Sequence, residues 1–363
     1  MSQATKPIQN HLDQDMMINL GSFYTPKILV SKAYELLEKY IDKQKDYIFL
    51  DTSCGYGDFF IKNLHYIGAD IDKLALSKVK NAKSIWTNAL VDVNRAKFGI
   101  SESQKLIIIG NPPYNDKTSI IRSKLKKELY SCDERLKHRD LGISFLRSYA
   151  LLKPDFVCVL HPLSYLIKRT NFKALNDFRL RFRLIDSLIV SSQFFTPNSS
   201  TFFPIIIALY QKNDEGMDYE YIQKYIFKTL ENHHFSLSQF DDIDHYICKY
   251  PNPNDKRKAI AYFHTLRDIN ALKRNQTFMQ KPNSNSIKIF EENLKYYVYI
   301  HFFKEYAYLL PYYFGNMNIF IDNVAFKNIE NELLAWFYKK TYNKEKIKAY
   351  FDTLFWKFRD RNE

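Results

Sequence analysis

Residues 106–114 read Leu-Ile-Ile-Ile-Gly-Asn-Pro-Pro-Tyr, a short apolar run that ends in a glycine and a rigid loop. An apolar run of this length, bounded by Gly and Pro, predicts a buried strand of a parallel sheet, which is covered on both faces. Open parallel sheets bind their ligands at the carboxyl ends of the strands. The sequence therefore predicts an α/β fold whose binding site includes this loop.

The loop has the chemistry of an acceptor site for an amine. Two successive prolines fix their φ angles and remove two backbone donors, which leaves the Asn111 amide oxygen and the Pro112 carbonyl free to accept. Tyr114 adds a flat face for a planar group. Acceptors on both N–H bonds of a ring amine would favour a pyramidal nitrogen with an available lone pair. The alternative is an ordinary turn at a strand end, where Asn-Pro is common.

Charge favours a polyanionic partner. The 53 Lys and Arg exceed the 40 Asp and Glu by 13, and residues 115–183 alone hold 16 basic and 7 acidic residues. The four cysteines form no C-x-x-C pair, which argues against a disulfide framework and a zinc site, so we expect no metal. The start lacks the apolar core of a signal peptide and no run of 18 apolar residues occurs, so a reducing cytoplasm is expected and a membrane is not.

The first half of the chain predicts strands that end in polar residues. Residues 1–20 read as an irregular arm, and Thr25 with Pro26 reads as the N-cap and first position of a helix. A strand at 47–50 leads into Asp-Thr-Ser-Cys-Gly-Tyr-Gly-Asp at 51–58 and a short helix from Phe59. Glycines in this loop allow close backbone approach to a ligand, but the third glycine of a dinucleotide fingerprint is missing.

The next two strands also carry candidate ligands. Residues 66–71 form a strand whose Asp70 is placed to accept the hydroxyls of a ribose, while Asp72 is placed to begin the following helix. Residues 84–88 form a third strand ending in Asn88.

Beyond the acceptor loop, residues 115–140 are rich in Lys and Arg. A solvated helical face is the ordinary interpretation of such a run, and phosphate contact is the alternative that its position favours. His161, at the end of a strand over 155–160, is interpreted as structural. Helices at 142–152 and 171–182 and strands at 184–190 and 202–210 complete seven strands.

The composition changes around residues 213–216, beyond which glycine is rare and aromatic residues and Asn abound. We expect an arm at 1–20, a catalytic domain at 21–212 and a further domain at 213–363. Its last helix, 330–358, should be interrupted near Thr341.

The Thr-Pro element, the D-x-x-x-G-x-G loop and Asn-Pro-Pro-Tyr, in this order, resemble the gamma-type N6-adenine DNA methyltransferases, which use S-adenosylmethionine. The resemblance covers about 210 residues and implies a Rossmann-like class I methyltransferase sheet of seven strands. It also implies a C-terminal mixed α+β target-recognition domain. The implied activity is methylation of N6 of a flipped-out adenine in duplex DNA, with S-adenosylhomocysteine as product. A separate cognate restriction endonuclease and a nucleoid-associated location in a bacterial cytoplasm are implied as well.

The resemblance assigns roles residue by residue. Catalysis falls to Asn111, Pro112 and Tyr114, and stacking of the target base to Tyr114 and Phe195, or to Phe194 in place of Phe195. The residues implied for S-adenosylmethionine are Thr25, Asp51, Gly55, Gly57, Asp70, Ile71, Asn88 and Asn111, and those for DNA are Lys117, Lys124, Lys126 and Lys127. Asn88 departs from the family, which usually has Asp there.

Two other functions stay open. Protein glutamine N5-methyltransferases use the same loop, because a side-chain amide is an equally poor nucleophile; the Thr-Pro element, the positive charge and the C-terminal region count against them. A DNA-binding specificity protein with an inactive methyltransferase fold is the non-enzymatic alternative, and the intact loop residues argue against it.

Overall fold

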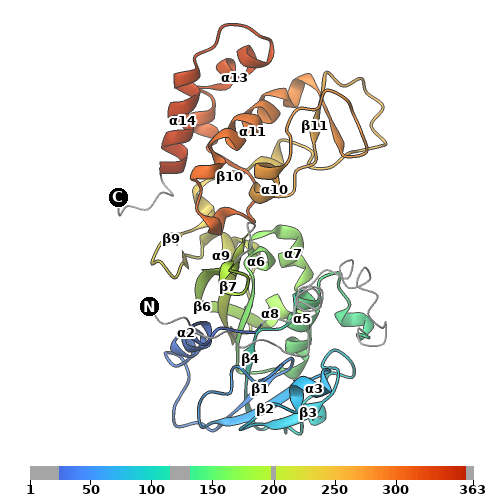
Figure 1. Ribbon diagram of the computed structural model, residues 1–363, viewed down its shortest axis with the longest axis vertical. Helices are drawn as coiled ribbons and strands as arrows, with labels where there is room; N and C mark the ends of the chain where they lie inside the picture. The colour runs from blue at the N-terminus through green and yellow to red at the C-terminus, as the bar shows by residue number, and fades with distance from the viewer. Residues whose placement is uncertain (1–23, 115–130, 198–201, 357–363) are drawn as a thin grey trace. The chain divides into compact units, whose positions relative to one another are not determined.

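The computed structural model describes residues 24–114, 131–197 and 202–356 (Figure 1). The chain divides into two compact units. The first, which we call the sheet unit, comprises residues 1–199, 205–222 and 227–232; the second, the C-terminal unit, comprises residues 200–204, 223–226 and 233–363. The sheet unit thus extends beyond residue 212, the end expected for a catalytic domain.

The sheet unit is built on one seven-stranded sheet with the order β3-β2-β1-β4-β5-β7-β6. Strands β1 to β5 pair in parallel, and β7 runs antiparallel to β5. The expected Rossmann-like sheet of seven strands is therefore confirmed. The strands are β1 (Tyr47–Asp51), β2 (His65–Asp70), β3 (Lys83–Trp86), β4 (Lys105–Gly110), β5 (Phe156–Pro162), β6 (Phe182–Ser191) and β7 (Pro204–Lys212).

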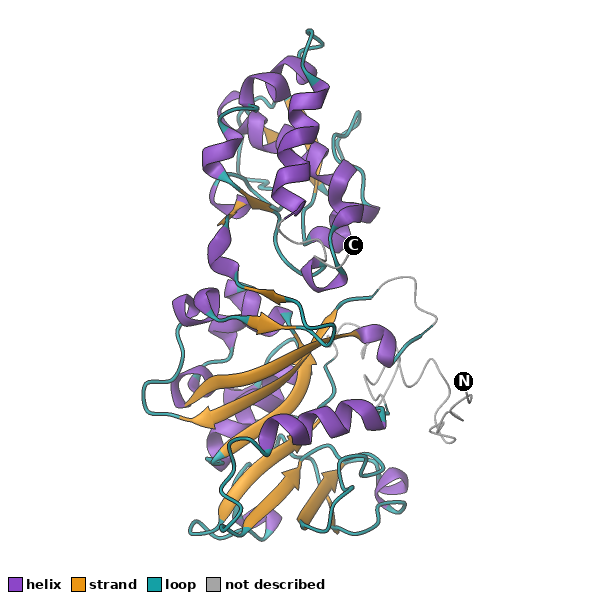
Figure 2. Cartoon of the chain, turned by 90° about the vertical axis from the view of Figure 1, so that its left-hand side faces the viewer, coloured by secondary structure: helices purple, strands orange, loops and turns teal. Residues whose placement is uncertain are grey.

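Helices cover both faces of this sheet. Every residue of β5 is buried, which requires cover on both sides. Figure 1 shows α2 (Lys27–Leu37) on one side of the strands and α5 (Leu141–Leu152) on the other, and Figure 2 shows the same strands after a turn of 90° about the vertical axis. The other helices are α3 (Lys73–Leu76), α6 (Ser164–Ile167), α7 (Arg169–Ala174), α8 (Asp177–Arg181) and α9 (Tyr219–Lys224), with 3-10 turns at Ala96–Phe98, Glu134–Leu136 and Ser192–Phe194.

The helix expected from Phe59 is absent. Residues 52–64 form turns, in which the Gly57 N–H donates to Cys54 O over 2.7 Å and the Phe60 N–H to Gly57 O over 2.9 Å. Only five residues, 60–64, lie between Phe59 and the start of β2. The Phe59 carbonyl accepts instead from the buried Tyr34 hydroxyl at 2.7 Å.

Two other helix predictions need correction. Helix α2 begins at Lys27 after Pro26, and no side chain caps it, so Thr25 is not its N-cap. The helix expected over 171–182 is divided into α7 and α8, because Asn176 adopts a left-handed φ of 49°. Asn tolerates that conformation better than most residues. The prediction that Asp72 begins the next helix is confirmed, since its carboxylate accepts from Leu74 N and Ala75 N.

The C-terminal unit packs around the helix α11 (Leu294–Tyr306), whose Tyr297 and Tyr299 are buried. The Tyr299 hydroxyl donates to Phe320 O at 2.8 Å, and the Tyr297 hydroxyl to Cys248 O at 2.8 Å. The interruption expected near Thr341 is confirmed. Further elements include two antiparallel pairs, β10 (Asp241–Asp242) with β13 (Phe320–Ile321) and β11 (Ala261–His264) with β12 (Ser286–Ile289), and helices α10 (Ile269–Arg274), α12 (Asn323–Phe326), α13 (Glu330–Phe337) and α14 (Lys344–Trp356).

No helix within residues 24–114, 131–197 and 202–356 is long and apolar enough to cross a membrane.

Candidate active site

Three segments distant in the sequence meet through two hydrogen bonds. The Asn111 Nδ2 donates to Thr25 Oγ1 over 3.2 Å, and the Thr25 N–H donates to Asp58 Oδ2 over 2.8 Å. Asn111 follows β4, Asp58 follows the loop after β1, and Thr25 precedes α2. The Thr-Pro element, the glycine loop and the acceptor loop are therefore joined at the carboxyl edge of the sheet, where open α/β sheets bind ligands.

The other end of the Asn111 side chain has no partner among the described residues. Its Oδ1 is buried and accepts no hydrogen bond, which for a buried acceptor costs about 1–3 kcal/mol. The bond from Nδ2 to Thr25 determines which end of the amide is held and which is available. Asn111 is thus an oriented acceptor that a ligand N–H would satisfy.

Asp51 lies directly against the strand that carries Asn111. A side chain on Gly110 would collide with it, since an added Cβ would stand 2.7 Å from Asp51 Oδ1. The Asp51 carboxylate accepts from Ser53 N over 3.0 Å. Burial raises the pKa of Asp51 well above its ordinary range, and the negative charges of Asp70 and Asp58 add to the rise.

Two further carboxylates complete an acidic cluster of Asp51, Asp58 and Asp70. Asp70 accepts from Gly55 N and from Asp72 N, each over 2.8 Å. Its carboxylate therefore links the glycine loop to the turn that follows β2. Burial raises the pKa of Asp70, and it raises that of Asp58 to about 6 against a partial opposing effect of the Thr25 N–H. Three carboxylates held together in surroundings that disfavour negative charge favour a cationic ligand.

The glycine loop leaves space beside this cluster. Gly55 has a left-handed φ of 52°, and an added Cβ would meet no heavy atom within 4 Å. Gly57 has a φ of 79°, and there a Cβ would collide with Phe60 at 2.7 Å. Glycine at position 55 thus allows the left-handed backbone and leaves space for a ligand to approach it. Glycine at position 57 allows both the left-handed backbone and the close packing against Phe60.

Ile71, expected to pack on an adenine, is 37% exposed although it is aliphatic. Trp86, which the sequence analysis did not single out, is 64% exposed, and its indole N–H donates to Ile71 O over 3.0 Å. Asn88 is already engaged, because its Nδ2 donates to Ser131 O at 2.8 Å and its Oδ1 accepts from Leu90 N at 2.9 Å. An apolar surface therefore follows Asp70 directly, while both ends of the Asn88 amide are used in hydrogen bonds within the protein.

The remaining predicted side chains lie near the ends of their strands. Pro112 is buried, and Tyr114, Phe194 and Phe195 are partly buried, so either phenylalanine stays a candidate for base stacking. Burial raises the pKa of Tyr114. The four lysines expected to contact DNA (Lys117, Lys124, Lys126 and Lys127) lie outside the described residues.

His161 belongs to the packing of the unit. It is fully buried, and its Nε2 lies 2.7 Å from the Tyr210 hydroxyl. Burial lowers its pKa to about 4. The structural interpretation of this histidine agrees with these contacts.

Asp58 is the functional candidate that sequence reasoning named only as part of the loop. A carboxylate directly after a two-glycine turn was the available signal. Its pairing with Thr25 depends on a contact across 33 residues, which no local pattern carries.

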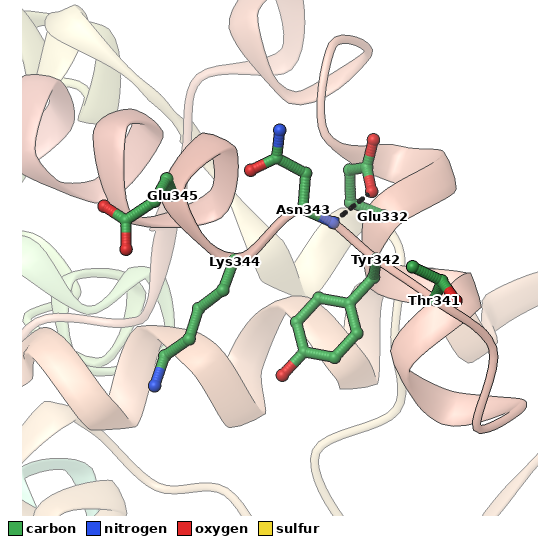
Figure 3. Close-up of a pocket in the computed structure, with 6 residues that line it drawn as sticks. All are labelled: Glu332, Thr341, Tyr342, Asn343, Lys344 and Glu345. Carbon is green, nitrogen blue, oxygen red and sulfur yellow. Dashed lines mark hydrogen bonds between the residues drawn. The ribbon is translucent and has the colours of Figure 1, made fainter.

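A hollow of about 490 Å³ lies in the C-terminal unit at the turn between α13 and α14. Figure 3 shows its lining residues, which come mostly from the turn itself; they are Glu332, Thr341, Tyr342, Asn343, Lys344 and Glu345. The Asn343 N–H donates to Glu332 Oε2 over 2.7 Å and closes the turn. None of the predicted site residues lines it. Over the described part of the chain, no group of three His, Cys, Asp or Glu side chains is arranged to hold a metal ion.

No family model and no curated protein matches this sequence. Among solved structures, the chain is similar to a protein of Listeria monocytogenes assigned to the class I S-adenosylmethionine-dependent methyltransferases, with 17% identity, 61% and 69% coverage of the two chains and a TM-score of 0.42. It is also similar to the E. cuniculi Mtq2–Trm112 complex, which methylates the termination factor eRF1, with 13% identity, 53% and 98% coverage of the two chains and a TM-score of 0.34. A third similar structure is a DrdV–DNA complex, with 14% identity, 71% and 34% coverage and a TM-score of 0.38. Because these TM-scores lie below 0.5, we base the functional conclusion on the site.

Proposed function

We propose that this protein is an S-adenosylmethionine-dependent methyltransferase that modifies N6 of a flipped-out adenine in double-stranded DNA. The observation that carries the proposal is the pair of hydrogen bonds joining Asn111, Thr25 and Asp58. They place an oriented amide acceptor beside the acidic cluster at the binding edge of the sheet.

The residues present fit S-adenosylmethionine. This cofactor carries a positive sulfonium and an ammonium group, and the carboxylates of Asp51, which is buried, and of Asp58 and Asp70, which are partly buried, favour positive charge. Asp70 would accept the ribose hydroxyls, Ile71 would contact the adenine, and the space at Gly55 admits a ligand against the backbone. The bound cofactor would supply an activated methyl group.

The chain's own contribution is to hold the amine. Asn111 Oδ1 would accept one N–H of the target amine and the Pro112 carbonyl the other, which favours an available lone pair on nitrogen. Tyr114, with Phe195, would hold the ring of the extruded base by stacking. Alignment of the two reactants would then provide most of the rate acceleration.

Positive charge and the second unit favour DNA as the substrate. The excess of 13 basic residues suits a polyanion, and residues 213–363 form the expected place for a target-recognition domain. Lysines at 117, 124, 126 and 127 would contact phosphates. In a restriction-modification system, a separate endonuclease would be the cognate partner.

A labelling experiment tests the proposal against its two rivals. The purified chain is incubated with methyl-labelled S-adenosylmethionine and, separately, with duplex DNA from a methylation-deficient bacterium and with a bacterial release factor. Label in DNA that disappears in Asn111→Ala supports the proposal. Label in release factor alone would favour a glutamine methyltransferase, and DNA binding without label an inactive specificity protein.

A further inference from the structure

The first turn of α5 approaches Tyr114 through a residue that has no side chain. A Cβ added at Gly142 would stand 3.0 Å from Tyr114 Cβ and 3.0 Å from Tyr165 Cε2, and closest of all to the Tyr165 hydroxyl. Gly142 is buried and its φ is not left-handed, so space and not backbone conformation requires glycine. Helix α5, Tyr114 and Tyr165 therefore meet at a point where a single methyl group does not fit.

Tyr165 cannot move aside at little cost, because it is held from two directions. Its hydroxyl donates to Asp140 Oδ1, and that carboxylate also caps α5 by accepting from Gly142 N over 3.0 Å. Its ring stacks on His161, with ring centroids 5.3 Å apart and planes 12° apart. His161 in turn lies 2.7 Å from the Tyr210 hydroxyl of β7, so Tyr165 is anchored to the sheet.

We propose that Gly142, Tyr165 and Asp140 are positioning residues that fix the Tyr114 ring in the orientation in which it stacks on the substrate ring. The inference rests on the proposed function, because it takes Tyr114 to be the stacking surface. Gly142 allows the close contact between α5 and Tyr114. Tyr165 packs against Gly142, and Asp140 holds both the Tyr165 hydroxyl and the first turn of α5 by hydrogen bonds. None of the three touches the substrate; they act through Tyr114.

The test places 3-fluorotyrosine at position 114 of the full-length chain and records its fluorine resonance in four variants. Gly142→Ala should shift or broaden the resonance, slow methyl transfer to unmethylated DNA by about 30- to 100-fold, and leave the dissociation constant for S-adenosylmethionine within about twofold. Adding Tyr165→Phe removes the atom nearest the new methyl group. The double variant should therefore recover at least about tenfold of the lost rate.

Ser148→Ala is the matched control, because Ser148 is also a buried small residue of α5, but its hydroxyl donates to Phe145 O at 2.7 Å. It should change neither the fluorine resonance nor the rate. Tyr165→Phe alone tests the proposal if Gly142→Ala does not fold, as judged by circular dichroism: loss of the Asp140 contact should still alter the resonance of position 114.

An unchanged fluorine resonance in folded Gly142→Ala, or in Tyr165→Phe, would overturn the positioning role. A double variant no faster than Gly142→Ala would overturn the part assigned to the Tyr165 hydroxyl. If the unmodified chain does not methylate DNA, the proposed function fails, while the fluorine spectra still decide whether the three residues position Tyr114.

Discussion

The Asn111 amide donates to the Thr25 hydroxyl across 3.2 Å, so one hydrogen bond joins residues that are 86 positions apart in the sequence. Thr25 thereby connects the acceptor loop with the glycine loop, because its N–H donates to Asp58. Because Nδ2 is used in this bond, Oδ1 is the end of Asn111 left to accept from a ligand. Substitutions at the two positions should consequently affect orientation of the amine more than assembly of the fold.

Asn111→Ala should abolish methyl transfer while changing cofactor affinity little, because the free acceptor faces the amine. Calorimetric titration with S-adenosylmethionine, beside a transfer assay, measures both quantities. Asn285→Ala, an exposed asparagine of the C-terminal unit, is the control and should change neither. A loss of cofactor affinity equal to the loss of transfer would refute the assignment.

Asp70→Ala should weaken S-adenosylmethionine by about 1.5–3 kcal/mol, the range for a hydrogen bond to a charged group. The structure adds a second cause, since Asp70 also accepts from Gly55 N and Asp72 N. Asp70→Asn keeps one acceptor oxygen for these amides and should lose less affinity. Calorimetry that finds the three proteins equal in affinity would remove Asp70 from the cofactor site.

The stability of the free protein should depend on pH through Asp58. Its ordinary pKa of 3.8 is raised by burial to about 6, so the folded protein binds the proton more tightly than the unfolded chain. The contribution of Asp58 to the free energy of unfolding therefore falls as pH rises from about 4 through about 6, and stays low above that range.

Asp58→Asn isolates this effect, because it removes the charge and keeps an oxygen that can accept from Thr25 N. The variant should gain melting temperature over the unmodified protein at about pH 7.5 and gain little at about pH 4.5. Thermal unfolding at both values checks it. A difference in melting temperature that is independent of pH would show that folding does not raise the pKa of Asp58.

Replacing Lys124, Lys126 and Lys127 by Ala should weaken binding to all duplexes alike. Phosphate contacts carry no sequence information, and each one lost should reduce the slope of log affinity against log salt by about 0.9. Replacing the exposed Lys39, Lys43 and Lys45 is the control. A salt slope unchanged by the first set would exclude these lysines from the DNA interface.

The strands were predictable because a strand buried on both faces requires consecutive apolar residues, such as the run 106–109. The carboxyl edge followed from the parallel topology, and with it the proximity of Asp51, Asp70 and Asn111. Asp72 was predictable as a cap because its contacts are two and three residues away.

Contacts between distant segments were not predictable in this way. Thr25 looked like an ordinary N-cap, yet its hydroxyl accepts from Asn111 and its N–H donates to Asp58. The turns after Asp58 replaced an expected helix because Tyr34 takes the Phe59 carbonyl from 25 residues away. Gly142 carried no local sign that a methyl group there would meet Tyr114.

The central claim is that the amine of adenine in DNA receives the methyl group. Duplex DNA from a methylation-deficient bacterium, incubated with the chain and S-adenosylmethionine and digested to nucleosides, is examined by mass spectrometry. We expect N6-methyldeoxyadenosine as the methylated nucleoside, and none after incubation with Asn111→Ala. The appearance of 5-methyldeoxycytidine or N4-methyldeoxycytidine instead, or of no methylated nucleoside from a folded protein that binds the cofactor, would contradict the account.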